Sequence, residues 1–560
     1  MFDVCIIGGG ASGMATAIAI KNINQEIEVC ILEKKDAVGR KLVATGNGKC
    51  NLTNINCAEY AETLEFFGAV GAVTRADSTG RVYPYSEDAA ELTALLEDRL
   101  AFYNVQVITG ATVTKVVAAD SKEDLTEDGA TVTKATVVEQ TEEGATVTKV
   151  VAADSEEDLK KDGATVTKVT AVEQTEDGAA VTGETATDVN LNLKQQGSYR
   201  IEYIAKGIIS KDGSAGSSAK STQVASAKST QVASAKSTQV ATAKSTQVAS
   251  EGATNHQTIE AHNVVIATGG KAGPQFGSTG DGYGIAKSFG HHVTRLAPAL
   301  AAVDTVNDLR ALAGVRAKGQ VTLIRNCGEN KIETPFCEEG EIQFTKDGLS
   351  GICVFNMSRY LKIPEGKTLE NGFKDYLVCV NFLSGGAPDG VLEHAIEILT
   401  ARQRIPGLMA RDILRTIVKE PLARDILTRS GFNFWKDWSE ENHPAIMNNG
   451  TESVALDAVF EREKDKKAAD LTEKAIERIA KNLTCWTCRV KGVKGWNFAQ
   501  ATAGGVELSE IDITTMESKL AKGLYFTGEV IDYDGPCGGY NLQNAWTTAM
   551  KAGRAIADPA

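Results

Sequence analysis

The fold is decided at the N-terminus, where residues 2–33 read FDVCIIGGGASGMATAIAIKNINQEIEVCILE. An apolar, strand-like run ends at Gly8, and Gly10 and Gly13 complete the spacing G-x-G-x-x-G before a helix of small residues. A second apolar strand ends at Glu33, twenty residues after Gly13. A strand, a glycine turn, a helix and an acid in this order predict a Rossmann-like nucleotide-binding unit.

Each residue of this fingerprint has a physical role. Gly8 permits the tight turn, Gly10 lets the backbone approach a pyrophosphate, and Gly13 lets the helix pack closely on the strand. The helix N-terminus offers free N–H groups and a positive dipole to the phosphates. Glu33 is placed to accept hydrogen bonds from both ribose hydroxyls, and its charge argues against a 2′-phosphate. These residues alone leave NAD and FAD both open.

Composition limits the class of protein. The chain has 560 residues, 42% of them apolar and 24% charged, as in a globular protein of several domains. No apolar run reaches the ~20 residues of a bilayer span, and the apolar N-terminus lacks the basic start of a signal peptide. Eleven scattered cysteines predict a reducing, cytoplasmic location. The net charge of −14, without clustered Lys or Arg, argues against a nucleic-acid partner.

Two repeats interrupt the chain. GATVTK begins at Gly110, Gly129, Gly144 and Gly163, and its alternation of β-branched residues with Ala and Lys predicts half-exposed strands. AKSTQVAS or a near copy then recurs four times within 219–250. With one Val per unit this array cannot bury enough surface to offset its ordering entropy. We interpret residues 110–255 as a surface insertion without a ligand-binding role.

The C-terminal segment supplies the second half of the predicted site. GLYFTGEVIDYDG, from Gly523, is typical of a strand whose end delivers Gly528 and Glu529 beside a ligand, where the acid can hold hydroxyls of a ribityl chain. Gly539 and Tyr540 then open a helix running to about Ala557. Such a helix N-terminus would stabilise negative charge at N1 and O2 of a reduced flavin. NAD has no such charge, so FAD is the cofactor we expect.

Two other segments are expected near the cofactor. The glycines of the loop 45–51 let backbone amides approach a planar ring, and Lys49 could favour an anionic flavin; a glycine turn with a solvated Lys49 is the alternative. Thr268, Gly269 and Gly270 follow the apolar run 264–266. They lie either at the dinucleotide or in simple packing, and the sequence leaves that choice open.

Six motifs in the same order resemble those of the BaiN/RdsA-like flavoproteins, also called aminoacetone-oxidase-family FAD-binding enzymes. They lie at 39–54, 264–270, 277–291, 340–351, 501–506 and 523–557. The resemblance covers nearly the whole chain except 110–255. It implies an α/β fold: a Rossmann-like, glutathione-reductase-like FAD-binding domain with an inserted β-barrel-like lobe, a helical insert and the repetitive surface insertion.

The expected domains follow the composition of each segment. Helical spacing marks VLEHAIEILTA, PGLMARDILRTIVKE and AADLTEKAIERIAKNL, with Pro406 and Pro421 at first-turn positions. The FAD-binding domain is expected at 1–109, 256–297 and 501–560, the repetitive insertion at 110–255, the β-rich substrate lobe at 298–385, the helical insert at 386–483 and the return strands at 484–500.

Together the residues and the resemblance nominate a set of FAD contacts. They are Gly8, Gly10, Ala11, Ser12, Gly13, Glu33, Lys34, Arg40, Lys41, Gly46, Asn47, Gly48, Lys49, Cys50, Asn51, Thr268, Gly269, Gly270, Gly528, Glu529, Gly539, Tyr540, Asn541 and Leu542. Tyr540 and Tyr533 are the candidate catalytic donors.

Other polar residues are interpreted as structural. Cys485-x-x-Cys488 lies in a strand-like run and not at a helix N-terminus, so a redox dithiol is disfavoured. Cys50 and Cys537 are read as small buried thiols. His291 and His292 are expected to cap or pack the end of the helix near Tyr283, and no metal site is expected.

The working hypothesis is an FAD-dependent oxidoreductase that moves a hydride through flavin N5. The BaiN branch implies NAD(P)H as transient reductant and, as small-molecule substrate, an activated C=C of a 3-oxo bile acid or steroid enone. The alternatives are an amine (aminoacetone-type) oxidase reoxidised by oxygen, an FAD-bearing RNA-associated protein, and a scaffold built on the repeats. No membrane contact and no obligate protein partner are inferred.

Overall fold

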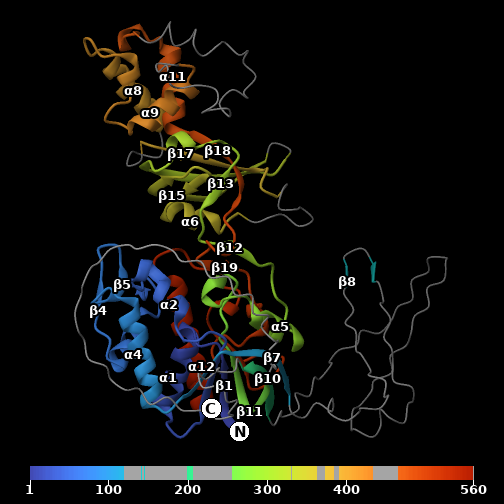
Figure 1. The fold of residues 1–560 in the computed structure, drawn as a ribbon. Helices are drawn as coiled ribbons and strands as arrows, with labels where there is room; N and C mark the ends of the chain where they lie inside the picture. Colours follow the sequence, from blue (N-terminus) through green and yellow to red (C-terminus); the bar gives the residue numbers. More distant parts are fainter. Residues whose placement is uncertain are drawn as a thin grey trace, which may run out of the picture.

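The structure is a computed structural model that describes residues 1–118, 140–141, 144–145, 198–205, 255–328, 331–361, 372–383, 390–432 and 465–558. Three bodies follow one another along the molecule: a sheet domain that holds both termini, a β-barrel, and a helical lobe at the far end (Figure 1). This arrangement confirms the predicted α/β fold with a barrel lobe and a helical insert.

The sheet domain is built around strand β1 (Phe2–Ile7). It pairs in parallel with β2 (Val29–Glu33) on one side and β11 (Asn255–Ile266) on the other. β6 (Gln106–Thr109) continues the sheet beyond β2, and β20 (Leu524–Phe526) pairs with β11. The apolar strand runs read in the sequence are buried here, as expected for parallel strands covered on both faces.

The first and last helices, α1 (Ala11–Ile23) and α12 (Tyr540–Ala557), pack against each other. Gly553 permits this contact, because a Cβ there would lie 2.6 Å from that of Ala19. Both predicted helices are confirmed. The packing brings the two ends of the chain to one face of the sheet.

Two strands of the predicted 110–255 insertion belong to the main sheet. β7 (Ala111–Ala118) and β10 (Tyr199–Ala205) form an antiparallel extension on the first half of β11. β7 contains most of the first GATVTK unit, which forms a strand as its alternation predicts. Of the later repeats, the structure describes only β9 (Gly144–Ala145), which pairs with β8 (Gln140–Thr141). The eight-residue array lies outside the described residues.

The barrel closes in the order β13-β16-β15-β14-β17-β18. Inward residues alternate with outward ones along its strands: in β17, Val378 and Val380 are buried while Cys379 faces out. Its last strand, β18, follows the helical lobe in the chain. The strands are β13 (Val303–Thr305), β14 (Arg316–Asn326), β15 (Ile332–Phe344), β16 (Gly348–Ser350), β17 (Tyr376–Asn381) and β18 (Trp486–Val493), and helix α6 (Ile352–Ser358) packs on them.

The helical lobe contains α8 (Val391–Gln403), α9 (Glu420–Arg429) and α11 (Glu473–Thr484). The predicted helix at 391–401 is confirmed. The predicted helix at 468–483 is confirmed from residue 473 onward. The predicted helix over 406–420 is wrong: this stretch holds only a short 3₁₀ turn, and its backbone turns left-handed at Gly407 and Thr416. Pro421 does occupy the first turn of α9, whereas Pro406 lies in a turn after α8.

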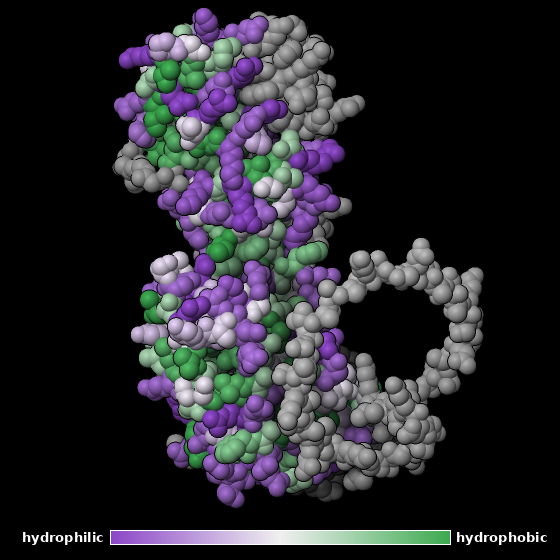
Figure 2. All heavy atoms as spheres, turned by 60° about the vertical axis from the view of Figure 1, so that its left-hand side comes forward, coloured by the Kyte–Doolittle hydropathy of each residue, from purple (hydrophilic) through white to green (hydrophobic). Residues whose placement is uncertain are grey.

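The sheet domain and the barrel meet at a narrow junction, visible as a constriction in the surface (Figure 2). Strands β12 (Ala297–Ala299) and β19 (Ala501–Ala503) pair there. No helix in the described part of the chain is long and apolar enough to cross a membrane. The remaining elements are α2 (Arg40–Ala44), β3 (Thr53–Asn54), α3 (Tyr60–Val70), β4 (Thr74–Ala76), β5 (Arg81–Pro84), α4 (Ala89–Phe102) and α5 (Asp281–Ser288).

Candidate functional site

A cavity lies at the carboxyl ends of β1, β2 and β11, where the order of the strands reverses direction along the sheet. Open α/β sheets bind their ligands at this edge. The predicted cofactor residues that line it come from both ends of the chain: Gly8, Gly10, Ala11, Ser12, Glu33, Lys34, Arg40, Lys41, Thr268, Gly269, Glu529, Asn541 and Leu542.

The first turn of α1 forms one wall of the cavity. No side chain caps this helix N-terminus and its first turn holds no acid, so its N–H groups and positive dipole remain available to an anion. A Cβ on Gly10 would meet nothing within 4 Å, whereas a Cβ on Gly13 would lie 1.9 Å from the Gly8 carbonyl oxygen. Gly10 therefore keeps the cavity open, and Gly13 serves the packing of helix on strand.

Glu33 is held in place by the backbone. The Gly9 N–H donates to Glu33 Oε2 at 2.8 Å and the Lys35 N–H donates to Oε1 at 2.8 Å. The carboxylate thus reaches the cavity with a fixed orientation, and each oxygen keeps further acceptor capacity. This suits the predicted contact with ribose hydroxyls.

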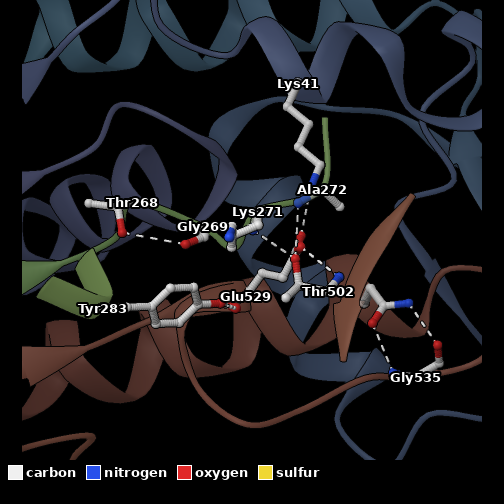
Figure 3. Close-up of polar contacts among 10 residues, drawn as sticks. Lys41, Thr268, Gly269, Lys271, Ala272, Tyr283, Thr502, Glu529 and Gly535 are labelled. Carbon is white, nitrogen blue, oxygen red and sulfur yellow. Dashed lines mark hydrogen bonds and ion pairs between the residues drawn. The ribbon is translucent and has the colours of Figure 1, made fainter. Parts of the chain in front are cut away.

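Glu529 is the centre of a polar network in the same cavity (Figure 3). Its Oε2 is 2.7 Å from Lys41 Nζ, and its Oε1 accepts the Thr502 N–H at 2.9 Å. Thr502 Oγ1 in turn accepts the N–H groups of Lys271 and Ala272, at 2.8 and 3.0 Å. The network ties the segments after β11 and β20 to β19 and to α2, and it fixes the acid predicted to hold the ribityl chain.

The segment after β11 divides between the two roles left open by the sequence. Thr268 and Gly269 line the cavity. Gly270 lies behind Glu529, because a Cβ there would come within 2.3 Å of Thr502 Oγ1 and 2.6 Å of Glu529 Oε1. The network therefore requires glycine at position 270, because any side chain there would displace Thr502 or Glu529.

The N-terminus of α12 is also uncapped by any side chain and free of acids in its first turn. Gly539 has φ of +101°, and a Cβ there would strike the Thr53 backbone at 2.5 Å. The segment before Thr53 is fixed to the same helix: Trp546 Nε1 donates to Leu52 O at 2.9 Å, and the Asn51 amide bridges Thr53 O and Gly539 N, each at 3.1 Å. The predicted loop 45–51 therefore ends beside the helix that was predicted to face the flavin.

The loop before α12 also contacts the barrel. Asn541 exchanges two hydrogen bonds of 2.9 Å with the backbone of Gly535. From the barrel side, Arg359 Nε donates to Asp534 Oδ2 at 2.8 Å, and Asn356 Oδ1 accepts the Cys537 N–H at 2.7 Å. The chain before α12 is thus braced by both domains, next to Tyr533 and Tyr540.

Several predicted residues do not line the cavity: Gly13, Gly46, Asn47, Gly48, Lys49, Cys50, Asn51, Gly270, Gly528, Gly539 and Tyr540, as well as Tyr533. Lys49 pairs with Glu87 at 2.5 Å on the exposed side of its loop, and Glu87 also binds Arg75. Gly528 packs against Ser12, where a Cβ would lie 2.5 Å from Oγ. Cofactor contact by this group remains a prediction.

The cavity also has walls that the sequence interpretation did not nominate: Gly9, Gly39, Thr45, Ala111, Val113, Phe276, Ser278, Asp281 and Gln500. Ser278 and Asp281 belong to the motif at 277–291, which was used for the family resemblance but not for the site, and Phe276 directly precedes that motif. Ala111 and Val113 were missed because β7 was assigned to the insertion.

Cys50, Cys537 and His291 have structural surroundings. Burial raises the pKa of Cys50 to about 12 and that of Cys537 to about 12, so both remain thiols at neutral pH. The backbone N–H of His291 donates to Ala286 O at the end of α5, so His291 packs at the end of this helix as the sequence predicts. Among the described residues no cluster of His, Cys, Asp and Glu could hold a metal ion.

The residues present fit a dinucleotide cofactor. The uncapped helix, the open space at Gly10 and the oriented carboxylate of Glu33 match a pyrophosphate and a ribose, while Glu529 and Lys41 lie in the same cavity toward α12.

Comparison with known proteins supports FAD as the cofactor. Two family models match the chain: the HI0933-like protein Rossmann domain over residues 208–555 and an FAD binding domain over residues 3–326. The 3-dehydro-bile acid delta(4,6)-reductase of Clostridium scindens is 27% identical over 100% of both chains. A ribosomal RNA dihydrouridine synthase of Haemophilus influenzae is 28% identical, covering 54% of this chain and 62% of that protein.

Among solved structures, a 3-ketosteroid-delta4-(5alpha)-dehydrogenase from Rhodococcus jostii matches at 12% identity, covering 100% of this chain and 97% of that chain with a TM-score of 0.37. The assignment rests on the family models, which together span both halves of the cavity. The chain belongs to the HI0933-like flavoprotein family and is an FAD-dependent oxidoreductase.

Proposed function

We propose that this protein uses NADH or NADPH to reduce an activated carbon–carbon double bond of a small organic substrate, with a 3-oxo bile acid or steroid enone as the first class to test. The observation that carries the proposal is the full-length similarity to a protein named for reduction of a bile acid double bond. The partial relatives are named for dihydrouridine, which is also the product of a C=C reduction next to a carbonyl.

When bound, FAD supplies a hydride acceptor and donor. The protein must then polarise the carbonyl of the substrate and deliver a proton to its α-carbon. Tyr533 and Tyr540 are the donors we propose, at the end of the chain where the barrel meets α12. Burial, first of all, raises the pKa of Tyr533, so its hydroxyl keeps its proton at neutral pH. Arg359, paired with Asp534, adds a fixed positive charge nearby.

NAD(P)H would dock only transiently. The one other glycine cluster that invites comparison, from Gly280 to Gly284, has the wrong spacing for a dinucleotide fingerprint. In the structure Gly282 packs against Thr268, where a Cβ would lie 2.2 Å from Oγ1. Gly282 therefore packs α5 against the segment after β11, and Gly280, at φ +86°, directly precedes the helix. We place a transient reductant at the mouth of the cavity.

The test is anaerobic photometry of the purified yellow protein. NADH or NADPH should bleach the flavin, and a 3-oxo-Δ4 steroid should restore the colour while its own double bond is lost. Bleaching by aminoacetone, with peroxide formed on aeration, would instead establish the amine oxidase and refute the proposal.

Tyr533→Phe and Tyr540→Phe separate the two half-reactions. Loss of the proton donor should slow reoxidation by the enone about 10²–10⁴-fold and leave bleaching by NAD(P)H unchanged. Equal slowing of both half-reactions would point to a structural role for these tyrosines.

A second candidate is reduction of uracil rings in RNA, favoured by the partial match to the ribosomal RNA enzymes. The net charge of −14 weighs against it, since RNA binding depends on Lys and Arg at the phosphates. Retention of ribosomal RNA through a moderate-salt column, with dihydrouridine formed on addition of NADPH, would establish this candidate.

A further inference from the structure

The Cys-x-x-Cys motif at 485–488 is not used by the flavin site, and the structure separates its two thiols. Cys485 is the C-cap residue directly after α11, and Cys488 lies on β18, where Trp486 and Cys488 are buried in the barrel. Neighbouring strand residues alternate between faces, so residues three apart point to opposite sides. Cys488 faces inward and Cys485 remains exposed outside.

Cys485 has a different partner. Its Sγ lies 2.7 Å from the Sγ of Cys379, a residue 106 positions earlier in the chain. Cys379 is on β17, with Leu377 and Asn381 on the outward face of the strand, and it lies opposite Thr487 of β18. The neighbouring strands of the closed barrel bring these two thiols together on its outer surface.

We propose that Cys379 and Cys485 form an oxidisable pair that closes to a disulfide bond when the protein meets a hydroperoxide. The sulfurs, 2.7 Å apart, need to approach by roughly 0.65 Å to reach the bonded distance of ~2.05 Å. The bond would tie β17 of the barrel to the end of α11 in the helical lobe.

Chemical character supports the pair. The hydrogen bond from the Cys379 thiol lowers the pKa of Cys485 to about 7, against the opposing effect of burial, while Cys379 has a raised pKa. Cys485 is thus the thiolate that attacks, and it is also the more exposed of the two. Cys379 resolves the intermediate.

The reaction balances with one peroxide. The Cys485 thiolate attacks the peroxide oxygen, the O–O bond breaks, and the leaving group departs as water or an alcohol, which leaves a sulfenic acid on Cys485. Cys379 then attacks that sulfur and displaces hydroxide, which takes up a proton and leaves as water. Two electrons pass from the two thiols to the peroxide, and a dithiol reductant reverses the change.

Other thiols are poorer partners. Cys337 and Cys379 both pair with Thr322, one from each side, so two strand spacings or about 9.5 Å separate them. Cys5 and Cys30 lie opposite each other on β1 and β2, but both are fully buried in the sheet. Of these close pairs, Cys379 and Cys485 form the one that an external oxidant can reach, through the exposed Cys485.

The experiment treats the whole FAD-loaded protein with stoichiometric hydrogen peroxide and blocks the remaining thiols by alkylation. Before alkylation, the intact mass should fall by two hydrogen atoms relative to the reduced protein. After alkylation, a non-reduced digest should contain the Cys379 and Cys485 peptides linked together. Dithiothreitol should release them. Either C379S or C485S should abolish the link, whereas C327S, which removes another exposed thiol, should leave it unchanged.

Links that join Cys485 to Cys488, or Cys379 to Cys337, would overturn the proposal, as would stable over-oxidation of Cys485 without a link. Flavin absorbance and thermal melting of both serine variants in the reduced state check that they are folded. Reduced C485S should melt like the reduced parent, because Cys485 is exposed.

Discussion

The sheet domain and the barrel with its helical lobe hold their polar groups for different purposes. In the sheet domain, backbone N–H groups fix Glu33 and leave the first turns of α1 and α12 open toward a ligand. In the lobe, the buried Asp425 carboxylate binds two donors of the protein itself. Trp486 Nε1 donates to Asp425 Oδ2 at 2.6 Å, and Arg429 Nε donates to the same oxygen at 2.7 Å. The sheet domain thus leaves helix N–H donors available for a ligand. The lobe uses its donors to join helix α9 to strand β18 through Asp425.

Because of this difference, different kinds of substitution should damage the sheet domain and the lobe. The predicted cofactor site needs the space that Gly10 leaves by having no side chain. A methyl group added at Gly10 would enter the cavity. The lobe depends on the presence of a partner for each buried charge, because an unpaired charge in an apolar interior is costly. Substitutions in each region should therefore fail separately, and the following predictions test this.

The largest effect is expected for Asp425→Ala. The side chains of Asp425 and Arg429 are only 4% and 14% exposed, so removing the acid leaves the guanidinium buried and unpaired. Arg429 would keep its hydrogen bond to Thr487 O but lose its counter-charge. The lobe should therefore lose about 3–5 kcal/mol of unfolding free energy. Urea denaturation followed by tryptophan fluorescence measures this loss, and flavin absorbance reports the sheet domain in the same samples.

Glu420→Ala is the matched control on the same helix. Glu420 pairs with Arg424 at 2.7 Å, but its side chain is 71% exposed, so the loss should stay near 0.3–0.5 kcal/mol. FAD should remain bound to Asp425→Ala under native conditions. Release of FAD together with unfolding of the lobe would mean that the two regions are one cooperative unit.

Gly10→Val tests the opposite case. The backbone of Gly10, at φ −79° and ψ −168°, accepts any L-residue, so the variant should fold. The added methyl groups would occupy the cavity and weaken FAD binding by about 1–3 kcal/mol, which is roughly 5–150-fold in Kd. Fluorescence titration of the apoprotein with FAD measures this, with the melting of the lobe as the internal reference.

Gly13→Ala is the contrast for that variant, since its Cβ would lie 1.9 Å from the Gly8 carbonyl oxygen. We expect it to yield little folded protein. If Gly10→Val binds FAD as the parent does, the phosphate end of the site has been placed wrongly.

What could be predicted from the sequence follows the same division. The fingerprint at Gly8–Gly13, Glu33 and the helix after Gly539 could be read because glycine spacing and helix starts are local properties of the chain. The polar network of Glu529 with Thr502 could not, because it joins residues whose proximity only the sheet topology creates.

Two misassignments show the limit. The helix expected over 406–420 has the apolar spacing of a helix, yet left-handed residues at Gly407 and Thr416 break it, and spacing alone does not report φ. Ala111 and Val113 were set apart with the repeats because their motif recurs downstream, although the first copy belongs to the main sheet and lines the cavity. Repetition in sequence does not imply the same place in the fold.

A smaller, pH-dependent effect is expected where α5 ends. His291 is buried between Ser518 Oγ at 2.7 Å and Glu510 Oε2 at 3.1 Å, and burial lowers its pKa despite the acid. The unfolded chain therefore binds a proton at a higher pH than the folded one. Stability should be full above the unfolded value of about 6.5 and should fall as the pH drops toward the depressed folded pKa.

Thermal melting between pH 8 and pH 5 would show this slope. His291→Asn should lower Tm at pH 8 and flatten the slope, whereas substitution of the exposed His292 should leave the slope in place. An unchanged slope in His291→Asn would assign the pH dependence to other groups.

The smallest effect is a gain of stability at Gly68 in α3. This glycine is exposed, and a Cβ there would meet nothing within 4 Å, so it serves neither the cavity nor the packing. Gly68→Ala should add roughly 0.5–1 kcal/mol by removing the entropy that glycine loses in a helix. Gly71 ends the same helix at φ +103°, so Gly71→Ala should destabilise instead. The two substitutions should change Tm in opposite directions, and neither should change the affinity for FAD. This result would separate glycines that serve the backbone of a helix from glycines such as Gly10, which leave space for the cofactor.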